Sequence, residues 1–232
     1  MSDRGSESSL RPRRDRETVR AHLVDVNDGI VATAGVVEGL LAAGASLSTI
    51  VVAALGAMVG GGVALGGMKY TEAADERDAE LAVLAEERRL HELQPEEELA
   101  ELATLYEDKG LSPALARRVA EELSTKDALL HHAEVEHGIT VTDDSPTPVG
   151  TAVLAGLGFM AGAAVPLGVS ALAPAAWRIP LTVLAVVAVL CLTATLVARL
   201  GGMRVGRTVL RTVAIGVLTM LLTLAGGSLF DL

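Results

Sequence analysis

Apolar residues fill two long stretches of the chain, about residues 23–68 and 149–230, and an acidic block at residues 71–146 separates them. A helix needs about twenty residues to cross a hydrocarbon layer about 30 Å thick. Divided at Gly, Pro and charged residues, the two stretches yield pieces of that length. The pattern therefore predicts five transmembrane helices, at residues 22–43, 47–70, 147–172, 179–199 and 208–229.

The acidic block has helical patterns with two interruptions. Residues 71–93 contain no helix breaker, so the second span is predicted to continue into water as one long helix. Pro95 ends that helix, a second is expected at residues 96–108, and Gly110 stops the second. A serine followed by a proline then starts a third helix, at about residues 113–137. We expect a three-helix domain and then a linker to the third span.

The placement of Lys and Arg near the span ends predicts the orientation. When five spans alternate, the basic residues before the first span, after the second and between the fourth and fifth fall on one side, and only Arg178 deviates. We therefore expect the N-terminus and the acidic block in the cytoplasm and the C-terminus outside, in the plasma membrane of a bacterium. The N-terminal residues are basic and lack the apolar core of a signal peptide.

The sequence thus predicts an all-α membrane protein with a cytosolic three-helix domain inserted between spans 2 and 3. The expected organisation is a disordered basic cytosolic tail at 1–20, spans 1 and 2 at 21–70, the acidic domain at 71–146, and spans 3 to 5 at 147–232.

The negative charge belongs to one segment. Residues 71–148 hold 21 Asp and Glu against 7 Lys and Arg, a net charge of −14, whereas the whole chain carries −10. Such a surface attracts cations and disfavours nucleic acid, because phosphate contacts need Lys and Arg. The lone cysteine, Cys191, excludes a disulfide or a thiolate zinc site within one chain.

Acidic residues also occur inside the first predicted span. Asp28 lies near its cytosolic third, and Glu38 follows ten residues later, about 15 Å along the helix. Ionisable side chains at such depth are costly and usually face a protein interior or water. We expect Asp28 to line a pathway, and Asp25, one turn earlier, to be exposed near the interface. Glu38 faces the same pathway or lies at the outer interface.

Carboxylates and imidazoles recur at helical spacing in the acidic block, where residues three or four positions apart share a face. Facing helices with such pairs can surround a divalent ion, and mixed oxygen and nitrogen ligands suit Fe(II), Mn(II), Zn(II) or Co(II) better than Ca(II). The alternative is a solvated charged face. The pairs are Glu98 with Glu101, Glu134 with His137, and His132 with Glu136.

The sequence Asp28-Gly29-Ile30-Val31-Ala32-Thr33 resembles the Asp-Gly motif in the first helix of the vacuolar iron transporter family. Members of this family are divalent-metal/proton antiporters. The five-span layout with an insert after the second span is also similar to that family. Further matching positions are Gly66-Gly67, Tyr70, Arg77-Asp78, Pro95-Glu96-Glu97-Glu98-Leu99-Ala100-Glu101-Leu102, Tyr106, Gly110-Leu111 and Glu136-His137-Gly138-Ile139.

The resemblance implies a homodimer whose first and second helices line a central metal path, with a cytosolic domain that gathers metal. Asp28 matches the pathway aspartate of the family. The resemblance assigns metal binding to Glu87, Glu98, Glu101 and Glu136, and His132 stands at the position of a family methionine.

The chain departs from the family pattern at three positions. Leu90 stands where a further metal-binding glutamate is expected, and apolar residues stand where the second helix should carry a methionine and a glutamate. Exchanging a soft thioether for imidazole and carboxylate would shift preference from iron toward manganese, cobalt or zinc. The candidate replacements are Glu86 or Glu92 for the glutamate, Met58 or Met68 for the thioether, and Glu38 for the carboxylate of the second helix.

These observations favour a transporter that exports Fe(II) or a similar divalent ion from the cytoplasm in exchange for protons, without a prosthetic group. One alternative is a membrane-anchored di-iron oxidase, because Glu134 and His137 form one Glu-x-x-His pair, although such a site needs two pairs. The other is a metal-binding sensor or assembly module that moves no metal.

Overall fold

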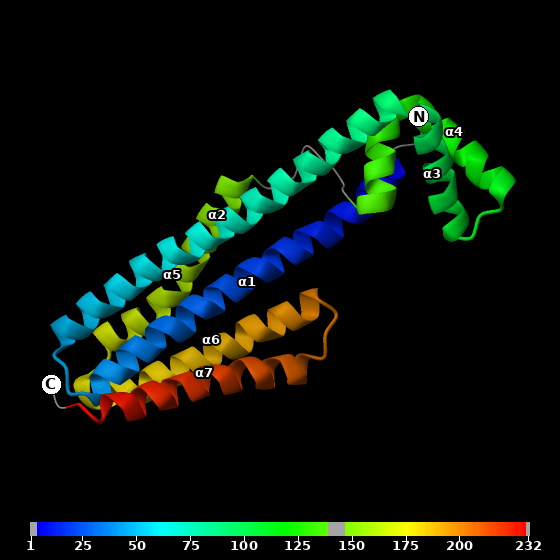
Figure 1. The fold of residues 1–232 in the computed structure, drawn as a ribbon. Coiled ribbons are helices and arrows are strands. Elements are labelled where there is room, and N and C mark those ends of the chain that lie inside the picture. Colours follow the sequence, from blue (N-terminus) through cyan, green and yellow to red (C-terminus); the bar gives the residue numbers. More distant parts are fainter. Residues whose placement is uncertain (1–3, 139–146, 231–232) are drawn as a thin grey trace. The chain divides into compact units, whose positions relative to one another are not determined.

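The computed structural model describes residues 4–138 and 147–230, and this part of the chain consists of helices and turns, with no strand. Side chains are described except at residues 4–15, 126–128, 130–132 and 134. Figure 1 shows the helices in sequence order. They are α1 (Arg4–Ala42), α2 (Leu47–Leu93), α3 (Pro95–Asp108), α4 (Pro113–His137), α5 (Pro148–Leu172), the short 3-10 helix η1 (Ala175–Trp177), α6 (Arg178–Leu200) and α7 (Val205–Gly227).

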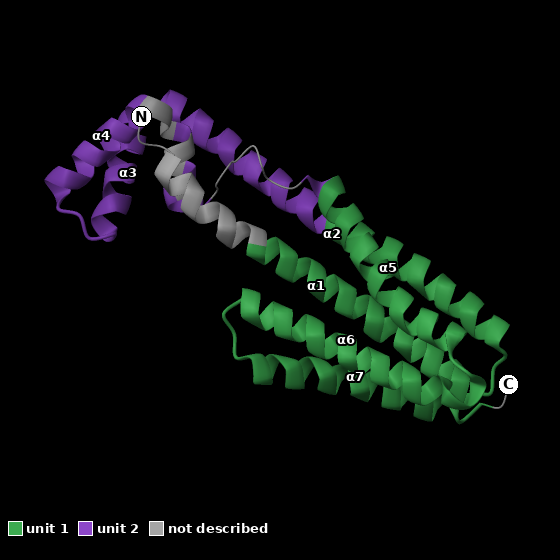
Figure 2. Cartoon of the chain, turned by 180° about the vertical axis from the view of Figure 1, so that it is seen from behind, with its two compact units in different colours: residues 1–70, 149–232 green, residues 71–148 purple. Residues whose placement is uncertain are grey.

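The chain forms two compact units, shown in Figure 2. Unit 1 comprises residues 1–70 and 149–232, and unit 2 comprises residues 71–148. The boundary falls within α2, which is one continuous helix, as the absence of a breaker predicts. Unit 2 covers nearly the residues expected for the acidic insert, 71–146.

In unit 1, α1 packs against α6 and α7, and these two helices also pack against each other. Their common core contains Ile30 and Ala34 of α1, Val186 and Leu190 of α6, and Met220 of α7. A hydrogen bond from the Thr193 hydroxyl to the Asn27 side-chain oxygen, 2.5 Å long, sets the register of α6 against α1. Buried polar groups that pair in this way hold helices together in lipid.

Glycines bring α5 against α1 and α2. A Cβ atom at Gly29 of α1 would lie 1.9 Å from the backbone oxygen of Phe159, and one at Gly162 of α5 would lie 1.9 Å from that of Val26. A Cβ at Gly66 of α2 would lie 2.9 Å from the oxygen of Ala152. No side chain fits at these three points, so the helices approach with their backbones nearly in contact.

Among the described residues, four helices are long and apolar enough to cross a membrane: α2, α5, η1 with α6, and α7. The predicted first span, α1, is not among them, because residues 25–42 include three carboxylates. Its N-terminus also differs from expectation. The tail predicted to be disordered at 1–20 is helical from Arg4, since its Arg and Glu residues favour helix and no breaker follows Pro12.

Unit 2 is built from the last turns of α2 together with α3 and α4. Its core contains Leu102, Ala103 and Ala120, with Tyr106 and Val135 packed against them. Pro95 and Pro113 occupy the first helical positions of α3 and α4, where a missing N–H costs nothing. Gly110 separates these helices with φ +99°, a conformation that other residues rarely adopt.

Candidate metal cluster and membrane carboxylates

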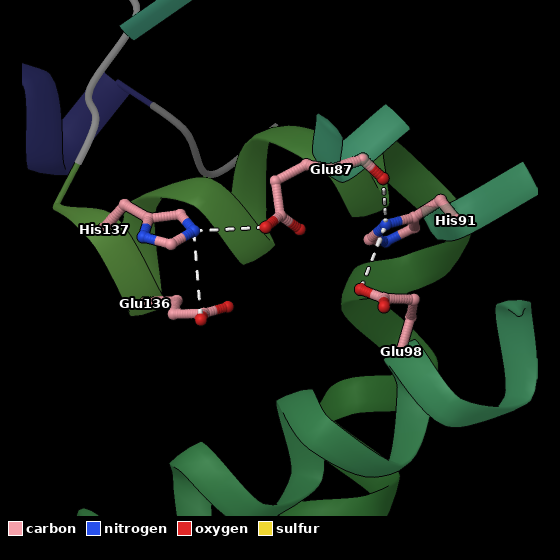
Figure 3. Close-up of polar contacts among 5 residues, drawn as sticks. All are labelled: Glu87, His91, Glu98, Glu136 and His137. Atoms are coloured by element: carbon pink, nitrogen blue, oxygen red, sulfur yellow. Dashed lines mark hydrogen bonds and ion pairs between the residues drawn. The ribbon is translucent and has the colours of Figure 1, made fainter. Parts of the chain in front are cut away.

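Three helix ends converge in unit 2 and bring five potential ligands together (Figure 3). Glu87 and His91 lie one turn apart near the end of α2, on the same face. The chain reverses at Pro95, which places Glu98, in the first turn of α3, beside His91. The last turn of α4 returns to α2 and contributes Glu136 and His137.

The first cluster consists of Glu87, Glu136 and His137, whose ligand atoms lie within 4.8 Å of one another. His137 Nε2 lies 3.1 Å from Glu87 Oε1 and 3.8 Å from Glu136 Oε1. The Glu87 side chain is buried, whereas Glu136 and His137 are exposed at the edge of the unit. Water and ions can thus reach the cluster from one side.

The second cluster consists of Glu87, His91 and Glu98, within the same 4.8 Å limit. His91 Nδ1 lies 3.1 Å from the backbone oxygen of Glu87 and 3.5 Å from Glu98 Oε2. Two acceptors near Nδ1 favour a proton on that nitrogen, which leaves the lone pair on Nε2. A backbone carbonyl commonly orients a metal-ligating imidazole in this way. Glu87 belongs to both clusters.

The spacing of these atoms suits a divalent transition metal. Oxygen and nitrogen ligands bind such an ion at about 2.0–2.2 Å, so neighbouring ligand atoms lie roughly 3 to 3.5 Å apart. The separations in the first cluster, 3.1 and 3.8 Å from His137 Nε2 to the two carboxylates, are close to this range, and the ligand atoms of the second cluster lie within 4.8 Å of one another. Carboxylate and imidazole together fit Fe(II), Mn(II), Co(II) and Zn(II). The net charge of −14 over residues 71–148 raises the local concentration of cations.

The other residues predicted to bind metal lie outside the two clusters. Glu86 forms an exposed ion pair with Arg89, at 2.6 Å, and this hydrogen bond holds the pKa of the Glu86 carboxyl below its usual value. Glu92 and Glu101 are exposed, and neither belongs to a cluster of the described residues. The side chain of His132 is outside the described residues, as is that of Glu134.

Sequence reasoning missed His91 and did not connect His137 with Glu87. The signal for His91 was present as the spacing Glu87-x-x-x-His91, which puts both side chains on one helical face. His137 was assigned only to the Glu-x-x-His pair with Glu134. The structure instead brings His137 to Glu87, fifty residues earlier in the chain.

The membrane residues divide into buried and accessible groups within unit 1. Asp28 is exposed, Met68 is 63% exposed and Met58 is partly buried. Glu38, by contrast, is 0% exposed, so its side chain is enclosed by the chain. Asp25 was expected to be exposed, but it is buried, 3.6 Å from His22, because Gly158 of α5 leaves room for it.

Comparison with known proteins identifies the relatives of this chain. The sequence profile of the VIT family matches residues 19–228. A vacuolar iron transporter of Acanthamoeba castellanii is 34% identical over 159 residues, which cover 68% of this chain and 58% of that protein. One of Toxoplasma gondii is 32% identical over 125 residues, 53% of this chain and 41% of that protein. The chain thus aligns with about half the length of each relative. Because the family profile covers most of its residues, this chain belongs to the VIT family.

Proposed function

We propose that this protein carries Fe(II), or a similar divalent transition metal, out of the cytoplasm in exchange for protons. The observation that carries the proposal is the cluster around Glu87, where carboxylates and imidazoles from three helices meet at metal-ligand spacing. The names of the two relatives support iron as the cargo. They also favour a transporter over the membrane-anchored oxidase.

In the proposed cycle, the ion first binds to unit 2 on the cytoplasmic side. Glu87 and Glu98 supply buried carboxylates, and His91 and His137 supply imidazoles. Weakly held, hydrated ions are thereby concentrated before they enter the membrane unit. Protonation of such ligands releases the metal, because metal and proton compete for the same lone pairs. Glu101, Glu92 and His132 remain candidates for further ligands.

Asp28 is the proposed entry point to the membrane pathway, with Met58 and Met68 as candidate thioether ligands. The Asp28 side chain is exposed in the single chain, and a carboxylate facing lipid is costly. We therefore propose a homodimer in which the second copy covers this face and the pathway runs between the copies. The positive-inside pattern supports an orientation with the N-terminus in the cytoplasm, and the proposed location is the plasma membrane.

Metal flux through liposomes tests the proposal. The purified full chain is reconstituted, Fe(II) entry is followed with a trapped fluorescent chelator, and a pH gradient is imposed in either direction. The proposal predicts Fe(II) flux above that of empty liposomes. The flux should be faster when the pH gradient drives protons out of the liposome while Fe(II) enters. Asp28→Ala should lose this flux. Wild-type flux in that variant would show that the pathway is assigned wrongly, and no flux in the parent protein would favour a sensor.

A further inference from the structure

A carboxyl group is enclosed in the membrane unit without a charged partner. Glu38 of α1 is 0% exposed, and neither of its carboxylate oxygens has a hydrogen-bond partner in the described structure. Thr182 on α6 is likewise 0% exposed, and its hydroxyl oxygen Oγ1 has no hydrogen-bond partner. Buried polar groups normally pair, so a fully enclosed carboxyl and a fully enclosed hydroxyl without partners call for a ligand.

The register of α1 and α6 puts these two groups on the same seam. The helices run antiparallel (Figure 1), and the hydrogen bond between Asn27 and Thr193 fixes which residues lie opposite each other. Eleven residues from Asn27 lead to Glu38, and eleven residues back from Thr193 lead to Thr182. Eleven residues make about three helical turns and about 16 Å, so both steps return to the starting face. Glu38 is therefore expected to face Thr182 across the seam.

The charges near this seam are few. The described residues of α5 and of α7 beyond Arg211 contain no titratable side chain, and neither does α2 before Lys69. On α1 itself the nearest are Asp25 and Asp28, at least ten residues away. The titratable residues of α6 are Arg178, Cys191 and Arg199, and Arg178, one turn before Thr182, is the nearest of them to Thr182 along the helix. It forms no ion pair with a described residue, and its Nε is buried without a partner.

We propose that Glu38 is a proton-binding site of the membrane unit, occupied as a neutral carboxylic acid. Its hydrogen-bond partner becomes Thr182 after a side-chain rotation, because neither group has a partner as the structure stands. An ionised carboxylate enclosed in apolar surroundings without a cation is strongly disfavoured, whereas the protonated form buries only a hydroxyl and a carbonyl. In this proposal Glu38 binds a proton and does not bind the metal. Proton binding at Glu38 is independent of the proposed function, and only the coupling of that proton to metal movement rests on it.

Exchange at this site is a simple acid–base step. The Glu38 acid releases its proton to water and becomes a carboxylate, and a proton from water restores it. A carboxylate that cycles in this way can link the two sides of the membrane to a pH gradient, because each side sets its own proton occupancy.

Infrared difference spectroscopy of the full chain in lipid tests the protonation state directly. At neutral pH, wild type minus Glu38→Gln should contain the C=O stretch of a protonated carboxyl, shifted in heavy water. Glu38→Asp, as a second variant, should retain such a band at another frequency. Thr182→Val should shift the band because a hydrogen bond is lost, and an unchanged frequency would overturn the Thr182 contact.

Two results would overturn the proton site. One is a difference spectrum that contains only carboxylate bands. The other is a C=O band of a protonated carboxyl that is absent from wild type and present in Arg178→Gln. That result would mean that Glu38 of the wild-type protein is ionised and forms an ion pair with Arg178. In liposomes, Glu38→Gln should lose the acceleration of Fe(II) flux by a pH gradient, whatever its absolute flux. If the C=O band of a protonated carboxyl is present in a protein that moves no metal, the transport proposal is wrong and the proton site is still supported.

Discussion

At the scale of single residues, Glu87 organises the proposed metal site. Glu87 is common to both clusters. Its side chain projects from α2, is buried, and lies close to the potential ligands from α3 and α4. Its neighbour Glu86 has the same chemistry but points to solvent and pairs with Arg89. Position on the helix, and not residue type, separates the proposed metal ligand from a surface charge.

The first prediction uses this pair. Glu87→Gln should weaken divalent metal binding by the full chain at least roughly tenfold, since even indirect partners of a metal site contribute 10- to 100-fold. Glu86→Gln, the matched control, should bind metal like wild type and lose only a surface ion pair. Calorimetric titration of both variants in detergent checks this. Equal weakening in the two variants would mean that acidity alone, and no defined cluster, holds the metal.

The second prediction concerns the imidazoles. His91→Ala and His137→Ala should lower affinity for Zn(II) and Co(II) more than for Mn(II), because imidazole suits the former ions better than it suits the harder Mn(II). Competition titrations with a coloured chelator give the three affinities for each variant. If all three ions lose affinity by the same factor, the histidines support the carboxylates and do not set selectivity.

At the scale of helices, close backbone contacts determine the arrangement of unit 1. Gly162→Ala should destabilise the protein, because the new methyl would lie 1.9 Å from the Val26 oxygen and the helices must separate. The expected cost is about 1–3 kcal/mol, typical of overpacking. Gly168→Ala on the same helix meets nothing within 4 Å and should be neutral or slightly stabilising. Thermal unfolding in detergent compares the two, and equal midpoints would contradict the tight α1–α5 contact.

The core of unit 2 gives a third contrast. Leu102 is 1% exposed, and Leu102→Ala should cost about 2–5 kcal/mol through lost burial and a residual cavity. Leu115 of α4 is 48% exposed, so Leu115→Ala should change little. Hydrogen exchange of the full chain reports on unit 2 separately. Similar exchange rates in both variants would argue against the α3–α4 core.

Local signals predicted much of this architecture. An unbroken run extended the second apolar stretch into α2, and Pro95, Gly110 and Pro113 marked the ends of α3 and α4 within one residue. The helical N-terminal segment, at residues 4–20, was not expected, because its composition fits both a polar tail and a solvated helix.

Tertiary contacts explain what sequence reasoning missed. Asp25 is buried because a glycine on α5 opposes it, and His137 meets Glu87 because α4 returns to α2. Neither contact is encoded by spacing within one helix. Glu38 is also buried, on a helix that packs against α6 and α7, more than 130 residues further along the chain.

At the scale of the whole molecule, the chain combines an acidic unit, in which potential metal ligands cluster, with a helical unit suited to lipid. The family match extends over both, from residue 19 to residue 228. If unit 2 binds the metal first and unit 1 carries it through the membrane, the two units have different kinetic roles. Unit 2 should set the metal concentration at which transport half-saturates, and Asp28 in unit 1 should set the maximal rate.

The dependence of initial Fe(II) flux on Fe(II) concentration, measured in liposomes under a fixed pH gradient, tests this account most directly. Glu87→Gln should raise the half-saturating concentration and keep most of the maximal rate. Asp28→Asn should lower the maximal rate severely with little change in half-saturation. If Asp28→Asn transports like wild type, or if Glu87→Gln leaves the whole curve unchanged, the proposed route from the cluster to the membrane aspartate is wrong.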